Sequence, residues 1–264
     1  MVTLIELIEL SLRIKERVSE YLGCDVEFEY SSEGGDTVRA VDEAARLEIE
    51  EWASGSKRPS IVSEENGFIE GEEEGLILID PVDGSSNADR GIPFSCVSIA
   101  YSRSRSLRDL SMAVILDLFS GNLFYAEEGR GAHKNGTKIS VREFRGTPVI
   151  YAPCQEPDPL RNLGFKQIAR RDYGSVALGL ALVAEGKIDA LVSLKEDLRA
   201  VDVAAGLLLV KEAGGSVFVN KMEVHGLERE LGVVAGVEQL SSRLAPKNYL
   251  RLWGTIGENL GIKR

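Results

Sequence analysis

The sequence has few of the residues that bind zinc or form disulfide frameworks. Its three cysteines, Cys24, Cys96 and Cys154, are dispersed along 264 residues, and its two histidines, His133 and His225, lie far apart. This spacing predicts no disulfide framework and no close pair of cysteine ligands for zinc. A zinc site built from histidine is disfavoured for the same reason.

Long apolar runs and an excess of positive charge are absent as well. No apolar stretch is long enough to cross a membrane, and the N-terminus lacks the basic start and the cleavage site of a signal peptide. We therefore expect a cytoplasmic protein with no membrane partner. The net charge of −11 argues against a nucleic-acid-binding surface. It also means that a phosphate substrate would need a local positive centre, which a bound metal would supply.

The composition is otherwise that of a globular protein, with 44% hydrophobic residues. Residues 3–22 have the spacing of an amphipathic helix. A membrane-surface helix is the alternative, which the mixed charge of its polar face disfavours. Residues 92–101, 110–118 and 122–126 favour short antiparallel strands, and 129–136 a turn before another strand. Strands then alternate with helices, with 158–170, 238–245 and 248–260 expected to be partly helical. We predict two domains, residues 1–147 and 148–264.

Residues 76–87, LILIDPVDGSSN, carry the clearest chemistry. Their apolar start predicts a buried strand, and we expect it to end at Asp80 because Pro81 has no N–H to continue a sheet. Asp80, the carbonyl of Val82 and Asp83 offer the oxygen ligands that Mg²⁺ prefers, so they could hold one or two metal ions.

The residues that follow, Gly84, Ser85 and Ser86, could open a helix whose free N–H groups point at an anion. Metal ligands and a phosphate cradle would then lie within one turn of each other, as in a metal-assisted phosphatase. For the pattern Asp-x-x-Asp-Gly alone, an ordinary turn after a strand is an equally good interpretation.

The other acidic candidates lie near predicted element ends, where a structural role is also open. Asp36 is in a glycine-bearing loop and could be only a turn former, and Asp42 could be only a helix charge favoured by the dipole. Glu64 follows a predicted strand, although Glu64-Glu65 is also typical of a solvated turn. Asp202 begins an apolar helix, where an Asp is normally a cap.

The string IDPVDGSSN resembles the metal-binding signature of the inositol monophosphatase and fructose-1,6-bisphosphatase superfamily. Residues 198–206 and 211–215 resemble its second signature, Trp-Asp-x-Ala-x-Gly with a downstream Glu-Ala-Gly-Gly, with Val201 where many members have Trp. The resemblance covers roughly residues 5–235. Its loops look most like those of archaeal-type enzymes that act on both inositol monophosphate and fructose 1,6-bisphosphate.

The resemblance implies the fold, the cofactor and the assembly. We expect an α+β or α/β protein with a layered αβαβα sandwich of the sugar-phosphatase type. Its sheet should be antiparallel in the N-terminal half and mixed in the C-terminal half. The implied cofactor is Mg²⁺, two to three ions per site with Mn²⁺ as a substitute, and the implied assembly is a homodimer.

The resemblance also implies a role for each site residue. Asp36 would bind a third, weaker metal ion, and Asp42 would pair with the hydroxyl of Ser85. Glu64 would bridge to the metal and the nucleophilic water, with Glu65 as the weaker candidate. The implied metal ligands are Asp36, Glu64, Asp80, Val82, Asp83 and Asp202. The implied substrate-binding residues are Gly84, Ser85, Ser86, Tyr151, Arg171, Gly174, Ser175 and Arg199.

The expected reaction is the hydrolysis of a small sugar or polyol phosphate. Two Mg²⁺ ions would polarise the phosphate and bind a water that attacks phosphorus in line, without a covalent phosphoenzyme. Asp42, acting through Ser85, would accept or orient the proton of that water. The N–H groups of Gly84 and Ser85 would stabilise the phosphoryl oxygens in the transition state. The expected catalytic residues are therefore Asp42, Glu64 and Ser85.

The substrate is less closely defined by the sequence. Lys195 stands where inositol-specific relatives tend to have a Glu, and Arg199 would suit a second phosphate unless it is a surface cation. A phosphatase of 3′-phosphoadenosine 5′-phosphate is the runner-up, although no adenine slot can be recognised. A non-catalytic metal- or metabolite-binding module is the third hypothesis; it should have lost a ligand, and none is lost.

Overall fold

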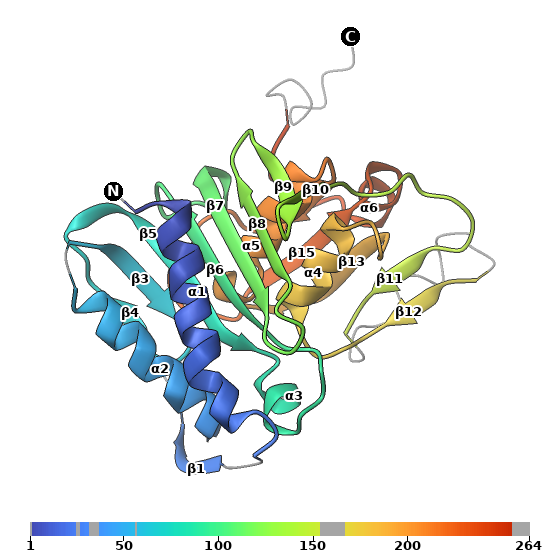
Figure 1. Cartoon of the computed structure of the whole chain (residues 1–264). Helices are drawn as coiled ribbons and strands as arrows, with labels where there is room; N and C mark the ends of the chain where they lie inside the picture. The colour runs from blue at the N-terminus through green and yellow to red at the C-terminus, as the bar shows by residue number, and fades with distance from the viewer. Residues whose placement is uncertain (1, 25–26, 32–36, 56, 154–166, 255–264) are drawn as a thin grey trace.

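The computed structural model describes residues 2–24, 27–31, 37–55, 57–153 and 167–254, and Figure 1 shows the arrangement of the chain. In the described part, helices α1 and α2 cover one face of an eight-stranded sheet. Helices α4 and α5 lie between this sheet and a six-stranded sheet, whose far face packs against α6. This is the layered αβαβα sandwich that was expected.

The eight-stranded sheet has the order β10-β9-β8-β7-β6-β5-β3-β4. Its strands are β3 (Pro59–Ser63), β4 (Gly67–Ile69), β5 (Glu73–Asp83), β6 (Cys96–Ser102), β7 (Leu110–Asp117), β8 (Leu123–Glu127), β9 (Gly131–Lys134) and β10 (Thr137–Ile139). Neighbours are antiparallel except for β3 and β5, which are parallel. Because β4 folds back against the outer side of β3, β5 takes the inner side and runs in the same direction as β3.

The six-stranded sheet has the order β12-β11-β13-β15-β14-β16 and is mixed, as predicted. Strand β11 is parallel to both β12 and β13, and the other neighbours are antiparallel. Its strands are β11 (Val149–Tyr151), β12 (Ala169–Arg171), β13 (Ala190–Leu198), β14 (Ser216–Val219), β15 (Leu231–Gly236) and β16 (Leu250–Arg251). A separate antiparallel pair, β1 (Glu27–Ser31) and β2 (Thr37–Arg39), precedes α2.

Helix α1 (Leu4–Val18) is the amphipathic helix expected near the N-terminus. It begins at a capping box, in which the hydroxyl of Thr3 accepts a bond from the Glu6 N–H and the Glu6 carboxylate accepts one from the Thr3 N–H. Its apolar face, including Leu7 and Ile14, is fully buried against the sheet beside α2 (Ala40–Ala53). Of the helices that the structure describes, none combines the length and the apolar character needed to span a membrane.

Strand β5 differs from its prediction at its C-terminal end. We expected it to stop at Asp80, but it continues to Asp83. Asp80 pairs with Ser98 and Asp83 with Cys96, so β5 has one residue more than β6 between the two pairs. This bulge accommodates Pro81, because a bulged residue needs no N–H for the ladder. It also places both aspartates at the edge where the site forms.

Helices α4 (Val176–Ala184) and α5 (Ala200–Glu212) form the central layer. Almost every side chain of α5 is buried, which fits its apolar sequence. The two helices approach closely because Gly206 has no side chain: a Cβ there would lie 2.4 Å from Cβ of Leu180. Val201, which stands in place of the family's Trp, is 1% exposed and packs in this core.

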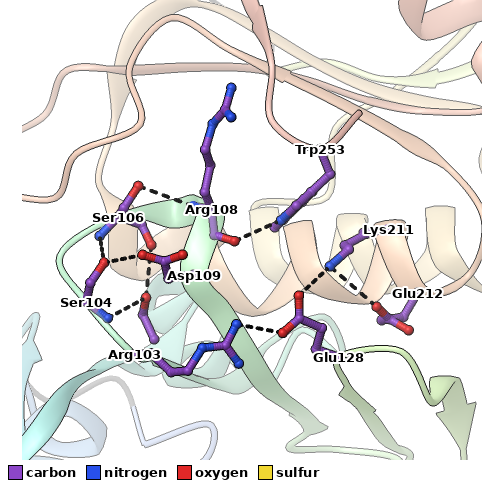
Figure 2. Close-up of polar contacts among 10 residues, drawn as sticks. Arg103, Ser104, Ser106, Arg108, Asp109, Glu128, Lys211, Glu212 and Trp253 are labelled. Carbon is purple, nitrogen blue, oxygen red and sulfur yellow. Dashed lines mark hydrogen bonds and ion pairs between the residues drawn. The ribbon is translucent and has the colours of Figure 1, made fainter. Parts of the chain in front are cut away.

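Polar contacts fasten the C-terminal end of α5 to the rim of the first sheet, as Figure 2 shows. Glu128 accepts hydrogen bonds from Arg103 at 2.7 Å and from Lys211 of α5 at 3.2 Å. Trp253 Nε1 donates to the carbonyl of Arg108 at 3.0 Å. The two halves are thus held together at the end of α5 that is remote from Asp202. Their division into domains at 147/148 stays a prediction.

Two segments that were expected to be partly helical extend into residues that the structure does not describe. Residues 154–166 lie outside the described part, and the end of the 158–170 segment is strand β12, which pairs in parallel with β11. The described portion of 248–260 reaches residue 254 and contains strand β16 and no helix. Leu250 and Arg251 of β16 pair with β14 at the edge of the sheet. Helix α6 (Glu238–Leu244) agrees with its prediction.

Candidate active site

Three carboxylates from separate segments meet at the C-terminal edge of β3 and β5. Because these strands are parallel and pair Ser63 with Ile79, the residues that follow, Glu64 and Asp80, emerge side by side. Asp202 joins them from the first turn of α5. One carboxylate oxygen from each of the three lies within 4.8 Å of the others. We call Glu64, Asp80 and Asp202 the acidic triad, and it could hold a metal ion.

The electrostatics of the triad favour a cation. Asp80 is 2% exposed, and burial raises its pKa well above the usual range, with further increases from Glu64, Asp83 and Asp202. Buried carboxylates at such short separations are costly unless a positive charge offsets them. Asp80 Oδ1 accepts a 3.1 Å hydrogen bond from the Val82 N–H, which holds the carboxylate at the start of the bulge.

Asp83 is held differently from the triad. Its Oδ2 accepts hydrogen bonds from the hydroxyl of Ser175 at 2.6 Å and from the N–H of Ala177 at 2.7 Å, both at the start of α4. Burial nevertheless raises the pKa of Asp83 to about 6, and these bonds reduce the increase. Asp83 lines the same cavity as the triad, and its role as a metal ligand stays a prediction.

The predicted phosphate cradle begins where β5 ends. Gly84 has a left-handed backbone with φ of +85° and precedes the single-turn helix α3 (Ser85–Asp89). A Cβ at Gly84 would lie 3.1 Å from the carbonyl oxygens of both Phe94 and Gly174, so only glycine fits without displacement. Asn87 ties this turn to the second half by donating to the carbonyls of Phe94 and Tyr173.

A cavity of about 400 Å³ contains the acidic triad and the cradle. Of the predicted site residues, those that line it are Asp42, Glu64, Glu65, Asp80, Val82, Asp83, Gly84, Ser85, Ser86, Gly174, Arg199 and Asp202. Glu64, and not Glu65, contributes to the triad. Asp36 lies outside the described residues. Sequence reasoning missed four lining residues, Arg39, Val176, Leu198 and Arg229.

Three predicted substrate-binding residues are not among those that line the cavity. Tyr151 is 1% exposed, with its ring packed against Gly179 in the core. Arg171 is exposed on β12, and its guanidinium donates to the carbonyl of Arg170. Ser175 is fully buried, where its hydroxyl caps α4 and binds Asp83. The structure therefore supports a structural role for Ser175 and Tyr151 behind the cavity wall.

Arg39 connects the two residues that were expected to pair directly. Its Nη1 donates to the hydroxyl of Ser85 at 3.1 Å and lies 4.0 Å from Asp42 Oδ2. The Arg39 N–H also donates to Asp42 Oδ2 at 3.0 Å, so Arg39 precedes α2 as its N-cap. A residue three positions before a helical Asp is brought next to it by this capping geometry, and that spacing could have identified Arg39 from the sequence.

Arg199 lies inside the site and is not a surface cation. It is 5% exposed, its Nη2 lies 2.5 Å from Glu64 Oε1, and its Nε lies 3.0 Å from Asp202 Oδ1. We expected this guanidinium to face the substrate, whereas the structure pairs it with two members of the acidic triad. The pairing follows from its position as the N-cap of α5, three residues before Asp202.

A larger cavity, of about 840 Å³, lies at the other end of the first sheet. Its walls come from the start of α1 and the rims of β5–β8, and they include Leu4, Tyr101, Arg103 and Met112. The acidic triad and the cradle are not part of its lining. We therefore place the chemistry in the smaller cavity.

Comparisons with known proteins identify the family of this chain. The profile of the inositol monophosphatase family matches residues 2–247. A fructose-1,6-bisphosphatase/inositol-1-monophosphatase of Archaeoglobus fulgidus is 32% identical over 248 residues, 89% of this chain and 89% of that protein. A bifunctional NADP phosphatase/NAD kinase of Methanococcus maripaludis is 30% identical over 213 residues, 70% of this chain and 38% of that protein. A solved inositol monophosphatase–fructose 1,6-bisphosphatase superposes with a TM-score of 0.78 at 25% identity, over 90% of this chain and 95% of that one.

Proposed function

Because this chain belongs to the inositol monophosphatase family, it is a phosphoric monoester hydrolase, and we propose that it releases phosphate from fructose 1,6-bisphosphate and inositol 1-phosphate with Mg²⁺. One observation carries the proposal. The acidic triad and the Gly84–Ser86 turn line the same cavity, so a metal held by the triad and a phosphate held by the turn would meet there.

The donor set of the cavity fits magnesium. Glu64, Asp80 and Asp202 offer carboxylate oxygens, and Val82 and Asp83 line the same cavity. Hard divalent cations prefer such oxygen ligands, so Mg²⁺ would bind here and Mn²⁺ would be a substitute. A bound cation would polarise the phosphoryl oxygens and allow water to ionise near neutral pH.

The protein's own groups would orient the water and the ester. The Ser85 hydroxyl, held by Arg39, would accept a hydrogen bond from the attacking water and pass its own proton to Asp42, so that the proton lost by the water ends on Asp42. The N–H groups of Gly84 and Ser85 would bind the phosphoryl oxygens as their charge changes. Attack in line forms the new P–O bond while the bond to the sugar oxygen breaks, and inorganic phosphate is released.

Once bound metal has offset the carboxylates of the cavity, its arginines would suit a substrate with a second phosphate. Three arginines, Arg39, Arg199 and Arg229, line a space that also holds the catalytic carboxylates. Planar guanidinium groups suit a second phosphoryl group. Lys195, on β13, is exposed and offers no carboxylate for inositol hydroxyls. Fructose 1,6-bisphosphate is accordingly our first substrate, and the name of the Archaeoglobus relative includes this activity.

The test is phosphate release with Mg²⁺ from four compounds side by side. They are fructose 1,6-bisphosphate, inositol 1-phosphate, 3′-phosphoadenosine 5′-phosphate and NADP, the last because of the Methanococcus relative. Asp80→Asn should lower release from the preferred substrate at least about 100-fold. Glu72→Gln, which removes an exposed carboxylate outside the cavity, should leave it unchanged.

Each result has a defined meaning. Release from the first two compounds, lost in Asp80→Asn, supports the proposal. A preference for either nucleotide would move the protein to a nucleotide phosphatase. No phosphate release from any of the four compounds, although Mg²⁺ binds, would favour the non-catalytic binding module. The homodimer expected from the resemblance is also a proposal, which light scattering of the purified protein would test.

A further inference from the structure

The guanidinium of Arg199 lies between two members of the acidic triad that come from different halves of the chain. It is 2.5 Å from Glu64 Oε1 after β3 and 3.0 Å from Asp202 Oδ1 on α5. The side chain of Arg199 is 6% exposed, that of Glu64 12% and that of Asp202 8%. This is a buried ion-pair network and not a surface salt bridge.

Arg199 engages both carboxylate oxygens of Asp202. Its backbone N–H donates to Oδ2 at 2.8 Å, and its side-chain Nε donates to Oδ1 at 3.0 Å. The backbone bond is part of the N-cap of α5 and does not depend on the side chain. The side-chain bonds are separate from the helix cap, so the guanidinium can leave without unwinding α5.

A divalent cation and this guanidinium compete for the same oxygens. A metal bound by Glu64, Asp80 and Asp202 would lie a few ångströms from a positive charge that already faces two of its ligands. Like charges at such a distance repel strongly where water is excluded. Charge-assisted hydrogen bonds also occupy the lone pairs that would coordinate the metal. The two cations therefore exclude each other from the edge shared by Glu64 and Asp202.

We propose that Arg199 is an internal counter-ion of the acidic triad, that a divalent cation displaces its guanidinium from Glu64 and Asp202, and that the displaced group then binds the substrate phosphate. The inference rests on the proposed function, since it assigns a metal to the triad and a phosphate to the cradle. It implies an order of binding: the metal must enter first, because phosphate gains the Arg199 contact only after the exchange.

The first test is metal binding without substrate. Mg²⁺ and, separately, Mn²⁺ are titrated into metal-free protein by calorimetry, for the wild type, Arg199→Gln and Arg199→Lys. Arg199→Gln should bind either metal about tenfold more tightly or better, because no positive charge has to be displaced. The metal affinity of Arg199→Lys should lie between those of the wild type and Arg199→Gln, because lysine keeps the charge but cannot contact both carboxylates. The melting temperature of Arg199→Gln in EDTA should fall, because the carboxylates lose their counter-ion.

Arg142→Gln is the matched control. Arg142 Nε pairs with the fully buried carboxylate of Asp189 at 2.7 Å, and neither residue lines the cavity. This variant should also lower the melting temperature, but it should leave the metal affinity unchanged. Tighter metal binding in Arg199→Gln alone would separate counter-ion exchange from a general loss of stability.

The second test is the binding of inorganic phosphate to protein saturated with Mg²⁺. Arg199→Gln should weaken it about tenfold, a change opposite in sign to the change in metal affinity. Equal or weaker metal binding in Arg199→Gln would overturn the exchange, and unchanged phosphate binding would overturn the second role. If Arg199→Gln does not fold, the metal affinity and the phosphate affinity of Arg199→Lys decide the exchange and the phosphate-binding role. No turnover is measured, so wild-type protein without phosphatase activity would refute the proposed function and leave this test intact.

Discussion

The hydroxyl of Ser175 donates a 2.6 Å hydrogen bond to Asp83 Oδ2 across 92 residues of sequence. The same oxygen accepts the N–H of Ala177, so the end of β5 is joined to the first turn of α4. An anion at this place is favoured by the free N–H groups and the dipole of the helix. The orientation of Asp83 is therefore determined by the C-terminal half of the chain.

Ser175→Ala should destabilise the protein and weaken the metal site. The variant loses the cap of α4 and a buried hydrogen bond to a carboxylate, together about 2–3 kcal/mol. Urea unfolding measures this loss, and the Mg²⁺ affinity should fall with it. Ser106→Ala removes a cap at an exposed short helix and should cost less than about 1 kcal/mol. Equal losses in the two variants would show that the Asp83 contact contributes nothing.

Gly84→Ala should be much more damaging than alanine at an unobstructed glycine. The new Cβ would meet two carbonyl oxygens at 3.1 Å in addition to the left-handed backbone strain, for a total of about 2–4 kcal/mol. Gly136 has φ of +81° and open space around it, so Gly136→Ala reports the strain alone, about 1 kcal/mol. Thermal unfolding and phosphate release should both separate the variants. Similar losses of stability in Gly84→Ala and Gly136→Ala would rule out crowding at Gly84.

Asp80→Asn should stabilise the metal-free protein while abolishing its response to metal. Burial, and then repulsion from Glu64, Asp83 and Asp202, raises the pKa of Asp80 well above its usual range, so its negative charge is unfavourable. At pH 8 in EDTA, removing that charge should raise stability by about 1–3 kcal/mol. Added Mg²⁺ should raise the melting temperature of the wild type and leave that of Asp80→Asn unchanged. A lower melting temperature for Asp80→Asn in EDTA would contradict the repulsion argument.

The metal-free protein should lose stability as the pH rises from about 4 to about 6. The pKa of Asp83 in the folded state, about 6, exceeds the ordinary value of 3.8, so the folded state binds the proton more tightly than the unfolded chain does. The proton on Asp83 therefore contributes on the order of 3 kcal/mol to the free energy of unfolding below pH 4. This contribution is lost as the pH rises through 6. Urea unfolding in EDTA across this range measures it. Asp83→Asn should flatten the slope, and an unchanged slope would reject the assignment to Asp83.

Much of the architecture was predictable because it depends on local patterns. The apolar run before Asp80 predicts a buried strand, and the spacing of Leu7 and Ile14 predicts one face of a helix; both are present. The motifs also identified the carboxylates of the acidic triad one segment at a time. The end of β5 was predicted wrongly because a bulge, which depends on the partner strand, accommodates Pro81.

The arrangement of the site was decided by the tertiary structure. Parallel pairing of β3 with β5 brings Glu64 beside Asp80, and the burial of α5 brings Asp202 to both. The same packing brings Arg199 against the carboxylates and buries Ser175 behind Asp83, outside the cavity lining. Sequence patterns record which groups are available and on which element they lie. Which groups share a buried space depends on contacts between distant segments, and burial sets the pKa values and the ion pairs that follow.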